Sequence, residues 1–367
     1  MENTKHNINT RRLKSLFREM VDIYSPSGKE EEITELLAGY LHEKGLPVTL
    51  REVSDGRRNV EVVFSDSKPD IAFIGHIDTV PAFDIEEYGF EEKDGIVSGL
   101  GTADMKGGCA AMIEAFIAMV ESGHKTDRAG LFLVVGEEES GDGTAALLES
   151  RSFPWAIVAE PTNLMPCLSH YGYMEMLVRA FGTRRHASIA CREYNAIFGM
   201  LNMLLTLGKV FEEKHSDAVL NIRDIHSSEA GFAVPGCCEA WVDLHIPPTA
   251  DPAAFSRRLE DVVNDSLKGS AATGYEIEFP ILAKGYKLTE RGLVPKLLRK
   301  AYNDLGLIWQ SGAFESHSDA NLLWQAGCKP VILGPGQLAK AHTSDESVEF
   351  EQIVTAAKIY HQLLMGL

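Results

Sequence analysis

The sequence contains no hydrophobic run long enough to cross a membrane. A membrane-spanning helix needs roughly 20 consecutive apolar residues, and no stretch of the 367 residues approaches that length. The first ten residues, Met1–Thr10, also lack the apolar segment of a secretory signal peptide. We therefore expect a cytoplasmic protein that has no membrane partner.

Paired cysteines are lacking as well. The six cysteines are scattered and no two of them form a CxxC motif; they are Cys109, Cys167, Cys191, Cys237, Cys238 and Cys328. Cys237 and Cys238 are adjacent and poorly placed to bond to each other. We expect reduced thiols, several of them in the core, as is usual for cytoplasmic proteins.

The chain also lacks an excess of basic residues. It has 35 Lys and Arg against 53 Asp and Glu, a net charge of −18. Nucleic acids and anionic membranes are bound through basic surface, so we expect neither partner. A hydrophobic content of 45% is ordinary for a globular protein, and 367 residues exceed one average domain. We therefore expect two domains.

The first half of the chain alternates helical patterns with short apolar strands. The segment Ser27–Glu30 has the pattern of a capping box, and Gly45 marks the end of the helix that follows. Strands are expected at Val48–Val53, Asn59–Phe64, Ile71–Ile74, Leu131–Val135 and Ala156–Ala159, with a helix at Ala110–Val120. Short, fully apolar strands between helices predict an α/β fold with an open, largely parallel sheet.

The pattern changes near Tyr173, where half-exposed strands and longer helices predict a compact α+β insert. Its expected elements are strands at Met174–Phe181, Val219–Ile225, Phe232–Ile246 and Tyr275–Phe279 and helices at Glu193–Leu207 and Pro252–Leu267. The α/β pattern then returns with a helix at Leu293–Leu305, a strand at Val331–Leu333 and a helix at Ser347–Met365. We expect a split catalytic domain, 1–172 and 284–367, around an inserted domain, 173–283.

Acidic and imidazole side chains recur in loops and after the apolar runs of the catalytic part. Ligands of open α/β sheets gather at the carboxyl ends of the strands, which is where these residues fall: His76, Asp78, Asp104, Glu137, Glu138, Glu160 and His342. Singly, a histidine after a strand is more often structural, and three consecutive acids usually form a solvated turn. Together, carboxylates and imidazoles without a thiolate suit zinc, cobalt or manganese, and they predict a hydrolytic metal site.

Several motifs in a fixed order strengthen this interpretation. They are GHIDTVP at 75–81, GLGTADMKGG at 99–108, GEEESGDGT at 136–144, AEPTNL at 159–164, SDANLLWQAGC at 318–328, LGPG at 333–336 and AHTSDE at 341–346. In these motifs, and over nearly its whole length, the chain resembles the two-zinc aminoacylase and carboxypeptidase metallopeptidase family. That family includes acetylornithine deacetylase, succinyl-diaminopimelate desuccinylase and glutamate carboxypeptidase. The resemblance implies a zinc-hydrolase catalytic domain with an inserted dimerisation or lid domain, and a homodimer.

The resemblance also implies two divalent metal ions per subunit, with Zn²⁺ as the first candidate and Co²⁺ or Mn²⁺ as alternatives. One ion would be held by His76, Asp104 and Glu160, and the other by Asp104, Glu138 and His342. Asp104 would thus bridge the two ions, which would share a hydroxide.

Two further acidic roles follow from the same resemblance. Asp78 would orient the His76 ring, and Glu137 would be the general base. Glu139 leaves a one-residue ambiguity in this run of acids. We choose Glu137 and Glu138 because that register places Gly141, Gly143 and Thr144 as in the family.

The predicted insert contains a further candidate catalytic residue. His186 resembles the family's histidine that reaches into the active site of the other subunit and stabilises the tetrahedral oxyanion. From the residue alone, a surface role would be favoured. Two positions depart from the family: Phe232 stands where an asparagine is common, and His245 replaces an arginine. Together with Ser318 they are candidate substrate contacts.

These observations predict a di-metal amidohydrolase that cleaves the amide bond of an N-acyl amino acid and resembles acetylornithine deacetylase. Dipeptidase, carboxypeptidase or succinyl-diaminopimelate desuccinylase-like activity on the same scaffold is the alternative. A catalytically silent binding or assembly protein belongs to another class; it would be expected to lack some ligands, and none is missing here. The sequence leaves open the acyl group, the amino acid and the native metal.

Overall fold

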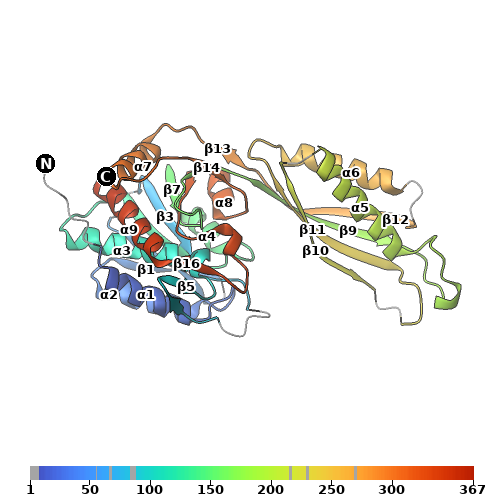
Figure 1. The fold of residues 1–367 in the computed structure, drawn as a ribbon, viewed down its shortest axis with the longest axis horizontal. Helices are drawn as coiled ribbons and strands as arrows, with labels where there is room; N and C mark the ends of the chain where they lie inside the picture. The colour runs from blue at the N-terminus through green and yellow to red at the C-terminus, as the bar shows by residue number, and fades with distance from the viewer. Residues whose placement is uncertain are drawn as a thin grey trace. The chain divides into compact units, whose positions relative to one another are not determined.

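The computed structural model describes residues 8–54, 56–65, 68–82, 88–214, 217–228, 231–267 and 271–367. The chain divides into two compact units. The first unit comprises Met1–Leu168, Leu288–Phe314 and Ser318–Leu367, and the second comprises Ser169–Lys287 with Glu315–His317. The second unit is therefore built mainly from one continuous segment between the two large parts of the first (Figure 1).

The first unit is built on a mixed sheet whose central strands are parallel. In spatial order its strands are β1 (Val48–Ser54), β2 (Arg57–Val63), β6 (Ala129–Val134), β3 (Ile71–His76), β7 (Trp155–Val158), β15 (Lys329–Ile332) and β8 (Cys167–His170). The pairs β6–β3, β3–β7 and β7–β15 are parallel, whereas β1, β2 and β8 pair antiparallel. Two short strands, β13 (Tyr286–Lys287) and β14 (Gly312–Phe314), pair with β8. The predicted α/β fold with a largely parallel sheet is confirmed.

Both faces of this sheet are covered, which explains the unbroken apolar strands. Alternate residues such as Phe73, Leu131 and Ile157 belong to one core cluster with five helices: α1 (Thr10–Asp22), α2 (Glu31–Glu43), α3 (Gly107–Glu121), α7 (Leu293–Asp304) and α9 (Phe350–Met365). The intervening residues, among them Phe132, point to the opposite face, where α4 (Asp142–Ser150) and α8 (Asp319–Gln325) contact the strands.

The second unit is an antiparallel sheet with two helices on one side (Figure 1). Its strands run in the order β10 (Val219–Ser227), β11 (Cys237–Ile246), β9 (Gly172–Phe181) and β12 (Gly274–Ala283), and its helices are α5 (Ala196–Lys214) and α6 (Pro252–Leu267). Met174, Met176 and Val178 alternate into a core shared with both helices. Glu175 and Arg179, on the other face of β9, form ion pairs instead.

Three local predictions were wrong. Ser27–Glu30 is no capping box, because α2 begins at Glu31 and the Ser27 hydroxyl donates to Asp78 instead (2.6 Å). The strand expected from Phe232 begins only at Cys237, after Pro235, which has no N–H to donate to a sheet. The helix expected from Ser347 begins at Phe350, because β16 (Ser347–Glu349) pairs with β5 (Ile96–Ser98) beside β4 (Glu91–Lys93).

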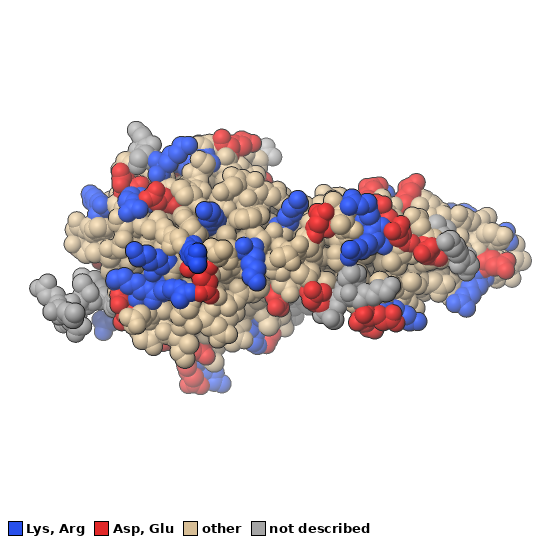
Figure 2. All heavy atoms as spheres, turned by 90° about the horizontal axis from the view of Figure 1, so that it is seen from above, with Lys and Arg blue, Asp and Glu red and all other residues tan. Residues whose placement is uncertain are grey.

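Surface and hydropathy features complete the description. Among the described residues, no helix combines the length and hydropathy required to cross a membrane. On the face displayed in Figure 2, basic and acidic side chains are interspersed, so the net charge of −18 is not gathered into one region there. All six cysteines are free thiols, and four of them are buried: Cys109, Cys167, Cys238 and Cys328.

Candidate metal centre

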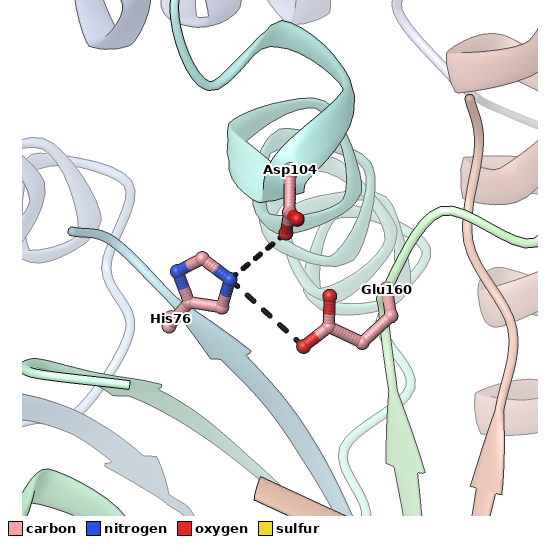
Figure 3. Close-up of side chains that lie close together, drawn as sticks. All are labelled: His76, Asp104 and Glu160. Carbon is pink, nitrogen blue, oxygen red and sulfur yellow. Dashed lines mark hydrogen bonds and ion pairs between the residues drawn. The ribbon is translucent and has the colours of Figure 1, made fainter. Parts of the chain in front are cut away.

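Three buried side chains from separate segments meet at the carboxyl end of the central strands. His76 is the last residue of β3, Glu160 follows β7, and Asp104 lies in the irregular turn η1 (Thr102–Lys106). The His76 Nε2 atom is 3.1 Å from Asp104 Oδ1 and 3.9 Å from Glu160 Oε1 (Figure 3). One ligand atom from each residue lies within 4.8 Å of the others, so the three could hold one metal ion.

A second group of potential ligands shares Asp104 with the first. His342 Nε2 is 3.0 Å from Glu138 Oε2 and 3.5 Å from Asp104 Oδ2. The ligand atoms of Asp104, Glu138 and His342 also lie within 4.8 Å of one another. Because Asp104 directs Oδ1 toward His76 and Oδ2 toward His342, its carboxylate lies between the two groups.

Asp78 is completely buried beside the first group. The His76 Nδ1 atom lies 3.0 Å from the backbone oxygen of Asp78 and 3.6 Å from its Oδ1. The Asp78 carboxylate accepts the backbone N–H groups of Glu137 (3.2 Å) and Glu138 (3.1 Å). Burial opposes ionisation, but the hydrogen bond and charge of His76 outweigh it, and the pKa of Asp78 lies below its ordinary value.

The second contact of Asp78 was not foreseen from the sequence. The family resemblance implies only that Asp78 orients the neighbouring His76 ring. The carboxylate also organises the turn that carries two acidic residues, Glu137 and Glu138, which lie 59 and 60 positions further along the chain. No local pattern signals such a contact.

Glu137 is placed to act on a molecule near His76. Its Oε2 atom lies 3.9 Å from His76 Nε2. Burial raises the pKa of Glu137 well above its ordinary value, opposed by the charge of His76 and assisted by the charges of Asp319 and Glu138. A carboxylate with a raised pKa suits proton transfer near neutral pH. Glu139, the alternative in the sequence, is exposed.

The two ligand groups bring several buried carboxylates together, an arrangement that favours a bound cation. Burial also raises the pKa of Glu138 and of Glu160. Clustered buried carboxylates repel one another, and a divalent ion would relieve that repulsion. Since the donors are only carboxylates and imidazoles, they fit zinc, cobalt or manganese.

The SDANLLWQAGC motif contains a residue, Asp319, that was not among the candidates named from the sequence. Asp319 is buried, and burial raises its pKa to about 7. Its charge acts on Glu137, so it belongs to the electrostatic surroundings of that residue. The only signal was its place within the SDANLLWQAGC motif. The neighbouring Ser318, a candidate substrate contact, is fully buried and its hydroxyl accepts the N–H of Ala320 at the start of α8 (3.2 Å).

His186, Phe232 and His245 all lie in the second unit. His186 is exposed, and its Nδ1 accepts the N–H of Ser188 (3.2 Å) at the short turn η2 (Ala187–Ile189). Accepting at Nδ1 places the ring proton on Nε2, which can then donate to an oxyanion.

The two positions that depart from the family do not lie together. Phe232 is 90% exposed, and its backbone oxygen accepts the N–H of Ala187 (2.9 Å). His245 lies near the far end of β11, with its ring 5.2 Å from that of Tyr173. A strand of this length separates them by about 30 Å, so within this unit they do not line a common pocket.

The fold and the two donor groups define a metal-dependent hydrolase. The chain belongs to Peptidase family M20/M25/M40, whose sequence model matches residues 72–366. One relative is the acetylornithine deacetylase of Edwardsiella ictaluri (strain 93-146), which is 28% identical in an alignment of 360 residues; 91% of this chain and 90% of that protein are covered.

Solved structures share the fold at lower identity. A tripeptidase from Staphylococcus aureus matches with a TM-score of 0.80 and 22% identity, covering 97% of this chain and 98% of that one. A Bacillus subtilis protein described as a dinuclear metal-binding peptidase of the M20 family matches with a TM-score of 0.68 and 14% identity, covering 97% of each chain.

Proposed function

We propose that this protein hydrolyses the amide bond of an N-acyl amino acid with the help of two divalent metal ions. The observation that carries the proposal is the shared carboxylate of Asp104, which lies between two groups of potential ligands. Such an arrangement suits a pair of ions that act on one substrate. Among relatives, the acetylornithine deacetylases support an N-acyl amino acid as the substrate class.

In this proposal His76, Asp104 and Glu160 hold one ion, and Asp104, Glu138 and His342 hold the other. When bound, the ions would polarise the scissile carbonyl and lower the pKa of the attacking water. Glu137 would take the proton of that water and deliver it to the leaving amine. Zinc is the first candidate for both sites, with cobalt and manganese as alternatives.

We further propose a homodimer formed through the second unit, to which His186 contributes an oxyanion donor for the partner's site. The second unit carries neighbouring exposed apolar side chains on helix α5 and on the edge strand β10. They are Phe198, Leu201, Leu205, Val219, Ile222 and Ile225. Exposed apolar surface of this kind is typical of an interface between proteins.

Peptidase activity is the second candidate, supported by the fold shared with a tripeptidase and a metallo-carboxypeptidase. A small-molecule substrate is common to both readings. The cytoplasmic location stays a prediction; six free cysteines are consistent with it.

The test combines metal analysis with a panel of N-acetyl and N-succinyl amino acids and dipeptides. We expect about two divalent ions per subunit, loss of hydrolysis on chelation and recovery with zinc or cobalt. Faster cleavage of dipeptides than of N-acyl amino acids would favour the peptidase reading. Full activity in metal-free protein would contradict both.

A further inference from the structure

The side chain of Glu346 holds the turn that carries Asp104. Its carboxylate, which is 4% exposed, accepts three backbone N–H groups. Oε1 accepts those of Ala103 (2.9 Å) and Asp104 (3.0 Å), and Oε2 accepts that of Gly101 (2.9 Å). The backbone oxygen of Glu346 also accepts the N–H of Gly99 (3.3 Å). Four hydrogen bonds from one residue therefore fix this short segment.

These bonds replace those that a regular helix would supply. Asp104 and Met105 have non-helical backbone angles, with φ and ψ of −119° and 96° and of −131° and 34°. Buried N–H groups in such a turn need an acceptor from elsewhere. The two oxygens of a carboxyl group can serve several donors at once.

The far end of the same turn is held by Lys106. This side chain is 1% exposed, and its ammonium group donates to the backbone oxygen of Ile23 (2.8 Å), directly after helix α1. Burial lowers the pKa of Lys106 to about 7, and the charge of Glu346 opposes this shift. The turn is thus anchored on both sides of Asp104, by the Glu346 carboxylate on one side and the Lys106 amino group on the other.

Glu346 also connects the two groups of potential metal ligands. It follows His342 by four residues in the AHTSDE motif, just before β16. The segment that carries His342 is therefore hydrogen-bonded, through Glu346, to the turn that carries the shared ligand Asp104.

We propose that Glu346 is a positioning residue that sets the orientation of the Asp104 carboxylate, so that its two oxygens serve two metal ions. The inference rests on the proposed function only in taking Asp104 as the shared ligand. Groups that orient a metal ligand typically contribute about 10–100-fold to metal affinity. We expect an effect of that size when Glu346 loses one acceptor oxygen.

The test variant is Glu346→Gln, which keeps the size of the side chain. The amide oxygen can still accept from Ala103 and Asp104, but the NH₂ group then faces the N–H of Gly101, donor against donor. We expect Co²⁺ titrated into metal-free protein to bind about 10–100-fold more weakly than in wild type. The visible absorption of the bound Co²⁺ should also change, because the ligand geometry changes.

A matched control separates this effect from a general loss of stability. Glu114 on α3 is also buried, and its carboxylate accepts the N–H of Asn9 (2.7 Å) and pairs with Arg12. Glu114→Gln should lower the melting temperature but leave Co²⁺ affinity and absorption unchanged. If both variants weaken Co²⁺ binding equally, or if Glu346→Gln binds it as wild type does, the positioning role is refuted.

The remaining outcomes also have defined meanings. If Glu346→Gln does not fold, Glu346→Asp replaces it, because its shorter side chain draws both acceptor oxygens away from the N–H groups of the turn; Co²⁺ binding as in wild type would then refute the role. Wild-type protein that binds no divalent ion would contradict the proposed function itself. Wild-type binding of two ions with an unaffected Glu346 variant would contradict this inference alone.

Discussion

The carboxylate of Asp78 accepts a hydrogen bond from the backbone N–H of Glu138 (3.1 Å). The other Asp78 oxygen accepts from the N–H of Glu137 (3.2 Å), while the backbone oxygen of Asp78 lies 3.0 Å from the His76 ring. One buried residue thus sets the position of a proposed metal ligand, of a proposed general base and of the imidazole of the first ligand group.

Replacing Asp78 with asparagine should disturb the turn that carries Glu137 and Glu138. The asparagine side chain has the size of the original but only one acceptor oxygen, so one of the two N–H groups would face an NH₂ group. We expect metal affinity to fall by about 10–100-fold and kcat to fall with it. Metal titration and steady-state kinetics check this, and a variant with unchanged metal affinity would show that these contacts are dispensable.

Glu137 and Glu138 should respond differently to the loss of charge. Glu137→Gln should lower kcat by roughly 10²–10⁴-fold while both ions stay bound, because it removes only a base. Glu138→Gln should lose one ion, and the exposed Glu139→Gln should behave as wild type. Metal analysis beside kinetics separates the roles; metal loss in Glu137→Gln would shift our assignment by one residue.

The role of His186 can be tested by mixing subunits. His186→Ala should reduce kcat without reducing metal content, since it lies in the second unit and not among the ligand groups. Hybrids of His186→Ala and Glu137→Gln subunits should regain activity, because one of their two sites would combine both intact groups. Once subunit exchange has been demonstrated, the absence of any recovery would place His186 outside the partner's site.

The residue at position 245 should affect recognition of the substrate carboxylate. A histidine cannot form the bidentate pair that an arginine offers, and burial lowers the pKa of His245 and so favours its neutral form. We expect poor activity on N-acetyl-ornithine and a small difference in kcat/KM between N-acetyl amino acids and their α-amides. A strong preference for the free acids that persists in His245→Ala would leave this position structural.

His170 should make the stability of the protein depend on pH. Burial lowers its pKa from 6.5 to about 3, opposed by a hydrogen bond to the backbone oxygen of Tyr171 (2.6 Å). Between these values the unfolded chain binds a proton that the folded chain does not, so stability is present above pH 6.5 and declines as the pH falls.

This single group can contribute a slope of up to about 1.4 kcal/mol per pH unit in that window. Melting temperatures of metal-free protein between pH 8 and 5 should therefore fall less steeply in His170→Asn than in wild type. The exposed His226→Asn serves as the control. Parallel curves for wild type and His170→Asn would exclude this contribution.

The sequence by itself determined the class of the fold and which residues could bind metal or transfer a proton. Strands that are buried on both faces of a sheet are continuously apolar. A run such as Ile71–Ile74 can therefore be recognised as a strand from a short stretch of sequence alone. The acids and histidines after those runs could be named in advance, since parallel strands bring their carboxyl ends to one edge. The structure groups five of these residues, His76, Asp104, Glu138, Glu160 and His342, as two sets that share Asp104.

Only the tertiary structure decided how those residues are held. Ser27 was expected to cap a helix and instead donates to Asp78, 51 residues away. Glu346 accepts from Gly101 across 245 residues. Hydrophobic periodicity specifies which face of an element is buried, but it carries no information on which buried N–H a distant carboxylate will meet. Those pairings are settled when the packed elements bring unsatisfied polar groups together and each must find a partner.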